Sequence, residues 1–251
     1  MGQIRQSPKL PGAQINYLLS PEGSDKGDLI LLLEGLIKEA GQWGAKQVLA
    51  EISPDSDGFS QFRRAGFSVL AKQRLFKFVG TGEIQTNLED HWRIWTSDDI
   101  YAMRCLYMAL VPPLIQPVEP LTRLEMLGLV YYDRSGELQA FADLVCGPVG
   151  VWVMPFVHPQ SGVDISELMV QMIADLPDLN GRPVYVAVRS YQPWIESALE
   201  SLSEERSLEQ VLMVKHLAIR QRVSVSVAFK ALENGNTEPT FPITPIKNNG
   251  S

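Results

Sequence analysis

The same order of predicted elements occurs twice in this chain, and this repeat limits the possible folds more than any other feature. Residues 28–67 read as a helix, a short strand, a second helix and a turn, and residues 164–202 repeat helix, strand, helix. Equivalent positions lie 138, 136 and 137 residues apart in the pairs Pro21 and Pro159, Val48 and Val184, and Phe62 and Leu199. A near-constant offset between two similar units predicts an internal duplication.

Apolar spacing predicts the first helix of each copy. Between Asp28 and Gln42 the apolar residues recur at helical intervals, and the same holds between Asp164 and Leu176. Such a stripe is typical of a helix that packs one side on a core. Short apolar runs predict the strands that accompany these helices: Gln47–Ile52, Ser68–Phe78, Pro183–Val188 and Ser207–Ile219.

The middle of the chain reads as a strand, a helix and a three-strand meander. The predicted strands are His91–Trp95, Leu127–Tyr132, Leu138–Cys146 and Val149–Val157, and the helix is Asp98–Ala109. The segment Pro112–Pro120 carries four prolines, so it cannot form a long regular helix. Asp133–Gly136 has the composition of a hairpin turn.

These elements predict a division of the chain into five parts. Residues 1–14 are expected to be a loose arm, 15–79 a partial unit, 80–90 a linker, 91–222 a complete unit and 223–251 a disordered tail. The first unit is too small to bury a sufficient core alone. We therefore expect its sheet to pack against or continue into the sheet of the second unit, or to pack on a second copy of the chain in a homodimer.

Composition and charge exclude several classes of function. The net charge of −7 opposes broad binding to nucleic acid or to an anionic membrane. The longest aliphatic run, Leu29–Leu33, is far too short to span a bilayer. Two cysteines cannot form a disulfide framework, which fits a reducing cytoplasm, and three scattered histidines lack metal-ligand spacing. We therefore expect a cytoplasmic protein without a metal.

The order helix, strand, helix, strand, with a corner at Ala65-Gly66-Phe67, resembles the C-terminal half of the GNAT acetyltransferase fold. Residues 91–222 resemble a whole GNAT domain. The chain is also similar to tandem GNAT-like proteins of bacterial genomes, in the residues Leu106-Tyr107, Val111-Pro112, Gln116, Glu119 and Leu121-Thr122. The resemblance implies an α/β fold of two GNAT-like units, with a mixed, mostly antiparallel twisted sheet flanked by helices and an incomplete first unit.

The resemblance also implies a place for acetyl-CoA. In active GNAT enzymes it lies in the gap between two splayed strands, and the loop after the first of them holds the pyrophosphate with backbone N–H groups. The matching loops here are Pro21–Asp28, which is acidic, and Pro159–Val163. We therefore expect the cofactor, if bound, at the second loop, on Val157, Gln160, Ser161, Gly162 and Val163.

The catalytic residues that the family pattern implies are incomplete. The usual general-acid tyrosine is replaced by Phe62 in the first unit and by Leu199 in the second. Tyr191 lies two helical turns earlier and could substitute only if the helix were shifted; a packing residue with a solvated hydroxyl is the favoured interpretation. Candidates for a general base are Glu51, Glu119, Glu125 and Asp143. Glu119 is preferred because it lies in the proline-rich segment, although an exposed loop glutamate would look the same.

Two functions remain open at this stage. The first is an N-acyltransferase, expected to be weak, that moves an acetyl group from acetyl-CoA to a small amine. The second is a catalytically inactive GNAT-like module that serves in binding or assembly.

Overall fold

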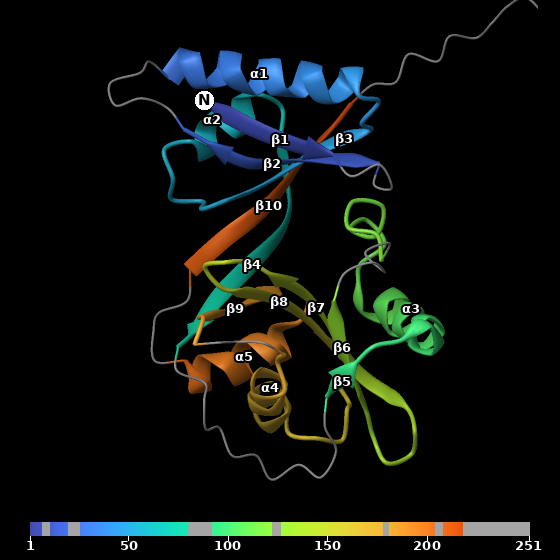
Figure 1. Ribbon diagram of the computed structural model, residues 1–251. Helices are drawn as coiled ribbons and strands as arrows, with labels where there is room; N and C mark the ends of the chain where they lie inside the picture. The colour runs from blue at the N-terminus through green and yellow to red at the C-terminus, as the bar shows by residue number, and fades with distance from the viewer. Residues whose placement is uncertain are drawn as a thin grey trace, which may run out of the picture. The chain divides into compact units, whose positions relative to one another are not determined.

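Ten strands form a single mixed sheet in the computed structural model, which describes residues 1–6, 11–19, 26–79, 92–121, 127–177, 181–203 and 208–217 (Figure 1). The strands are β1 (Gly2–Gln6), β2 (Gly12–Leu18), β3 (Gln47–Ile52), β4 (Ser68–Phe78), β5 (Arg93–Ile94), β6 (Gly128–Tyr132), β7 (Leu138–Cys146), β8 (Val151–Val157), β9 (Val184–Arg189) and β10 (Leu208–His216). Their order is β1-β2-β3-β10-β4-β9-β8-β7-β6-β5. The pairs β2–β3 and β8–β9 are parallel, and the other pairs are antiparallel. The predicted linker 80–90 and tail 223–251 lie outside the described residues.

Five α-helices flank this sheet: α1 (Lys26–Gln42), α2 (Phe59–Arg64), α3 (Ile100–Leu110), α4 (Ile165–Ala174) and α5 (Pro193–Leu202). A 3-10 turn, η1 (Ser97–Asp99), leads into α3. The predicted helices agree with these to within a few residues at each end. The Asp133–Gly136 turn is also confirmed, because the Gly136 N–H donates to the Asp133 carbonyl at 2.9 Å and Gly136 has φ +80°.

The internal duplication is visible in the order of the strands. From β2 to β4 the chain runs strand, α1, β3, α2, β4, and from β8 to β10 it runs strand, α4, β9, α5, β10. The last strand of each unit pairs with the inner strand of the other, because β10 lies between β3 and β4, and β4 lies between β10 and β9. The two units have therefore exchanged their last strands.

The centre of the duplication lies where β4 meets β10. Gln73 is directly opposite Gln210, 137 positions later, and its Nε2 donates to the Gln210 Oε1 at 2.6 Å. The next pair along the ladder, Arg74 with Glu209, also lies on opposite strands. This ladder joins both units in one sheet, which confirms the expectation that the first sheet continues into the second.

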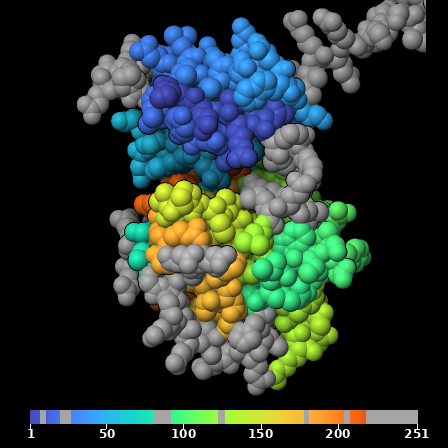
Figure 2. Space-filling view, in the orientation of Figure 1, coloured from blue at the N-terminus to red at the C-terminus, as the bar shows by residue number. Residues whose placement is uncertain are grey.

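The expectation of a loose arm over residues 1–14 is wrong. Gly2–Gln6 forms β1, which pairs antiparallel with β2, and β2 begins at Gly12. Ala13 and Ile15 are buried beneath α1, and β1 occupies the place that β7 has in the second unit. Pro8, Pro11 and Gly12 gave this segment a loop-like composition, whereas the alternation of Ile4, Ala13 and Ile15 is the strand signal. In the view of Figure 2, β1, β2 and α1 form one contiguous surface.

The two faces of the sheet carry different helices. Helices α1 and α2 pack on one face of the first unit, with Leu33, Phe62 and Met213 in their core. Helices α4 and α5 pack on the second unit, around Leu168, Ile195 and Leu199. The opposite face is covered by α3 and the segment after it. Its core includes Ala71 of β4 and Leu212 of β10 as well as residues of β6, β7 and β8.

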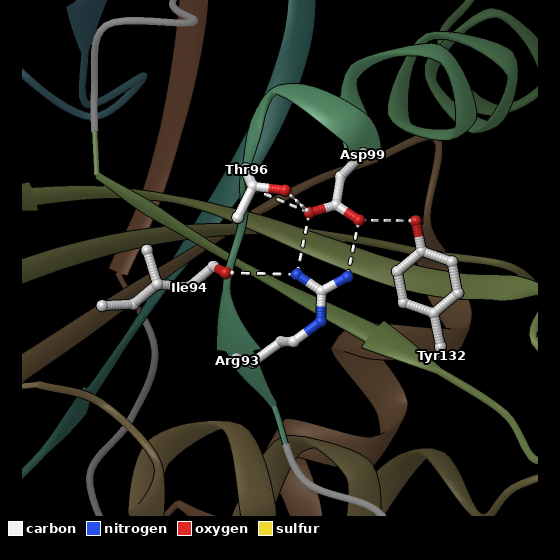
Figure 3. A network of polar contacts seen from close by, with 5 residues as sticks. All are labelled: Arg93, Ile94, Thr96, Asp99 and Tyr132. Carbon is white, nitrogen blue, oxygen red and sulfur yellow. Dashed lines mark hydrogen bonds and ion pairs between the residues drawn. The ribbon is translucent and has the colours of Figure 1, made fainter.

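A polar network fixes the start of α3 to the sheet (Figure 3). The Arg93 guanidinium donates to both carboxylate oxygens of Asp99, at 2.8 and 2.6 Å, and its centre lies 5.2 Å from the Tyr132 ring centroid. Asp99 also accepts from the Thr96 N–H at 2.7 Å and from the Tyr132 hydroxyl at 2.8 Å. The hydrogen bonds from Arg93 hold the pKa of Asp99 well below its usual range. Burial, followed by the bond to Asp99, raises the pKa of Tyr132 to about 12.

Candidate functional site

Two parallel strands diverge near the middle of the second unit. Strands β8 and β9 pair only over Val151 with Val184, Trp152 with Tyr185 and Val153 with Val186. Strand β8 continues to Val157 and β9 continues to Arg189, with no further pairing between them. Pro155 lies in the unpaired part and has no N–H to donate to a neighbouring strand. The carboxyl ends of the two strands therefore enclose an opening in the ladder.

The first unit has the same divergence. Strands β2 and β3 pair from Gly12 with Gln47 to Ile15 with Ala50, while β2 extends to Leu18 and β3 to Ile52. The opening thus belongs to the duplicated unit as a whole, and its two copies can be compared within one chain.

Side chains from the start of α5 occupy the opening in the second unit. The Val157 N–H donates to the Oε1 of Gln192 at 3.1 Å, and the Nε2 of Gln192 donates to the Pro155 carbonyl at 3.0 Å. The indole Nε1 of Trp194 donates to the Val157 carbonyl at 3.1 Å. Gln192 is fully buried. These three bonds replace the ladder that β9 would have made with this part of β8.

The loop between β8 and α4 contains the other predicted cofactor residues. The Gln160 N–H donates to Nδ1 of His158 at 3.1 Å, and the buried Ser161 hydroxyl donates to the Val163 carbonyl at 3.2 Å. Gly162 has φ +70°, and a Cβ placed on it would meet no atom within 4 Å. The five predicted residues therefore line one stretch from the end of β8 toward α4, with open space beside Gly162.

A carboxylate already caps the helix that follows this loop. Asp164 is the N-cap of α4, and its Oδ1 accepts from the Glu167 N–H at 3.0 Å. This contact satisfies one of the free N–H groups of the first turn. It also places negative charge at the helix end that would otherwise attract a phosphate.

A buried arginine lies at the end of β9, on the face covered by α3. Arg189 is fully buried, and its guanidinium donates to the Gln73 Oε1, to Glu51 at 2.9 Å and to Glu119. Its Nε has no hydrogen-bond partner. Burial opposes the charge, but the attraction of Glu119 and Glu51 outweighs it and raises the pKa of Arg189. Arg189 is therefore a fixed cation that joins both units and the proline-rich segment.

Tyr191 and Glu119 belong to the same polar group. Burial, followed by the negative charge of Glu119, raises the pKa of Tyr191, and Tyr107 and Asp143 act on it in the same direction. The Tyr107 hydroxyl donates to the Glu119 carbonyl at 2.6 Å, which ties the proline-rich segment to α3. Tyr191 therefore carries its proton at neutral pH, and the raised pKa makes it a weaker acid than an ordinary tyrosine.

The structure thus brings together most of the candidates that were chosen by position. Arg189 forms ion pairs with Glu51 and Glu119, and the charges of Glu119 and Asp143 act on Tyr191. Glu125 lies outside the described residues. Glu119 is an ion-paired and largely buried side chain, in contrast to the exposed loop glutamate considered as its alternative.

Sequence reasoning missed Arg189 and Gln192. Arg189 ends the otherwise apolar run Val184–Val188, and a charged residue at the end of a buried strand is the signal that could have found it. Phe62 and Leu199, which stand where the family's tyrosine would be, are buried in the two helical cores. They take no part in the polar group.

In the part of the chain that the structure describes, no group of three or more histidine, cysteine, aspartate or glutamate side chains is arranged to hold a metal ion. Likewise, none of the helices described is both long and apolar enough to cross a bilayer.

No protein-family model matches this chain, and no curated protein matches it. Solved structures do. A GCN5-related N-acetyltransferase from Kribbella flavida is similar with a TM-score of 0.59 and 11% identity, over 86% of this chain and 86% of that one. A GCN5-related N-acetyltransferase from Sphaerobacter thermophilus has a TM-score of 0.51 and 12% identity, over 87% and 77%. A conserved protein from Staphylococcus epidermidis, described as functionally unknown, has a TM-score of 0.58 and 12% identity, over 86% and 91%.

These structures align with this chain over most of both lengths. At such low identity the likeness concerns the fold and leaves substrates open. The chain has the GNAT fold, built here as two units that exchange their last strands within one sheet.

Proposed function

We propose that this protein is an acyl-CoA-dependent N-acyltransferase that moves an acetyl group from acetyl-CoA to a small amine. The observation that carries the proposal is the divergence of β8 from β9 after Val153 and Val186. The opening has a loop with free space beside Gly162 at the end of β8, and the polar group around Arg189 at the end of β9. A cofactor and an acceptor could therefore approach the same strand ends.

In this proposal the loop from Gln160 to Val163 holds the phosphates of acetyl-CoA. Backbone N–H groups before a helix are suited to that task. The carboxylate of Asp164 opposes it, since it already takes the Glu167 N–H at 3.0 Å. We therefore expect binding weaker than in a loop without such a cap.

The acceptor amine would bind on the face covered by α3. Glu51 and Glu119 place two carboxylates against the guanidinium of Arg189, so this group favours a cationic ligand. The amine must lose a proton before its nitrogen attacks the thioester carbonyl, and Glu119 is the proposed acceptor of that proton. As the C–S bond breaks, the thiolate leaves and takes a proton from Tyr191.

The loop assignment is tested by placing a leucine at Gly162. Gly136 is a matched control, because it also has positive φ, at +80°, and it also has no atom within 4 Å of an added Cβ. Gly162→Leu and Gly136→Leu therefore carry a similar backbone penalty at two different places. Binding of acetyl-CoA is measured by titration calorimetry on the full-length chain.

The proposal predicts that Gly162→Leu abolishes binding and that Gly136→Leu leaves it unchanged. Equal binding by both variants would show that the cofactor does not bind at this loop. No binding by the unmodified chain would favour the inactive module.

A further inference from the structure

Three backbone groups on the unpaired edge of β8 are already hydrogen-bonded to side chains of the same chain. Gln192 bonds the Val157 N–H and the Pro155 carbonyl, and Trp194 bonds the Val157 carbonyl. We propose that Gln192 stands in for a ligand on this edge, so that an extended amide chain can pair with β8 only after Gln192 leaves. For acyl-CoA, whose pantetheine arm is such a chain, this inference rests on the proposed function.

The contacts of Gln192 are those of a neighbouring strand. Its Oε1 accepts from the Val157 N–H at 3.1 Å, and its Nε2 donates to the Pro155 carbonyl at 3.0 Å. A carboxamide carries one acceptor and one donor group, as a peptide unit does. An extended ligand that adds to a strand edge needs these same two backbone groups. Gln192 and the ligand therefore compete for them.

Burial makes this competition costly for the ligand. Gln192 has no exposed surface, and neither Pro155 nor Val157 is paired with β9. A ligand can pair with β8 only in molecules in which these two buried hydrogen bonds are broken. Its observed affinity is therefore its intrinsic affinity multiplied by the fraction of such molecules. Gln192 thus lowers the affinity for any ligand of this edge.

The first unit provides an internal comparison. The residue 137 positions before Gln192 is Asp55, whose N–H donates to the Ser53 Oγ at 3.3 Å. Within the described ranges, no side chain is hydrogen-bonded to the backbone of Asn16 or Leu18 on the equivalent edge of β2. The occupied edge is therefore a property of the second unit and not of the duplicated fold.

The variants Gln192→Ala and Gln192→Ser remove the carboxamide and keep the backbone at the start of α5. Two substitutions are used so that the test survives if one fails to fold. Gln171→Ala is the control, because Gln171 is also buried and its Nε2 donates to Asp175 at 2.8 Å. Two properties are measured: amide exchange at Val157 without ligand, and calorimetric affinity for acetyl-CoA and for pantetheine.

The inference predicts that the Gln192 variants exchange the Val157 amide proton faster and bind both ligands at least about tenfold more tightly. Gln171→Ala should change neither property. Tighter binding of pantetheine without binding of acetyl-CoA would refute the proposed function and support the inference. Binding of both ligands that is unchanged or weaker in the Gln192 variants would overturn it. Binding of neither ligand by any variant would also overturn it.

Discussion

The ion pairs of Arg189 should be strongly non-additive, and this can be tested without knowing any ligand. Arg189 is fully buried and donates to two carboxylates, Glu51 and Glu119. We consider Glu51→Gln, Glu119→Gln and the double variant. Each glutamine keeps the shape and one acceptor oxygen but removes the negative charge.

The expected magnitudes follow from what remains beside the guanidinium. With one glutamate left, Arg189 keeps a charged partner, and a charged hydrogen bond becomes a neutral one at a cost of about 1 kcal/mol. With neither left, the cation is buried without a counter-charge, a situation that costs about 3–5 kcal/mol. The double variant should therefore lose about 1–3 kcal/mol more than the sum of the single variants.

Urea unfolding of the four proteins gives these free energies, provided that the slope with denaturant is the same in all. Glu34→Gln, at an exposed position of α1, serves as the control for loss of one negative charge. Additive losses within about 0.5 kcal/mol would show that Arg189 does not depend on this pair of carboxylates, and would refute the reasoning.

Two further predictions concern stability. Asp99→Asn should lower the free energy of unfolding by about 2–3 kcal/mol at pH 7, because Asp99 accepts two hydrogen bonds from Arg93. The pKa of Asp99 is lowered in the folded state, so its contribution is complete above the ordinary carboxyl pKa of about 4 and declines as the pH falls below it. Urea unfolding at pH 7 and pH 3 should show the difference between variant and wild type shrinking at pH 3, and a constant difference would contradict this. Separately, residues 1–82 alone should give no cooperative, monomeric unfolding transition, since β3 and β4 are joined only through β10; such a transition would show that the first unit folds without the second.

Local patterns in the sequence predicted most elements of the fold. The apolar stripes of α1 and α4 placed both helices to within a few residues, and the repeat predicted two units of one kind. The exchange of β4 and β10 could not be predicted, because strand pairing depends on contacts between residues far apart in the chain. Strand β1 was missed because two prolines and a glycine near it carry a stronger local signal than its alternation.

The candidate site could be predicted only in part, because its residues lie far apart in the chain. Glu119 and Tyr191 were chosen by their position in the pattern, and the structure places both in one polar group. The partner that holds this group together, Arg189, ends an apolar strand, and sequence alone does not show which face it points to. Gln192 was missed because nothing in its local sequence shows that the edge of β8 lacks a neighbouring strand.

The most direct test of acyl transfer is the release of thiol from acetyl-CoA by the full-length chain over a panel of small amines. We predict slow, amine-dependent release that falls about 100-fold or more in Tyr191→Phe, the range in which a general acid acts. Fast release that Tyr191→Phe leaves unchanged would show that another residue supplies the proton. Acetyl-CoA binding without any amine-dependent release would contradict the account and identify the protein as an inactive module.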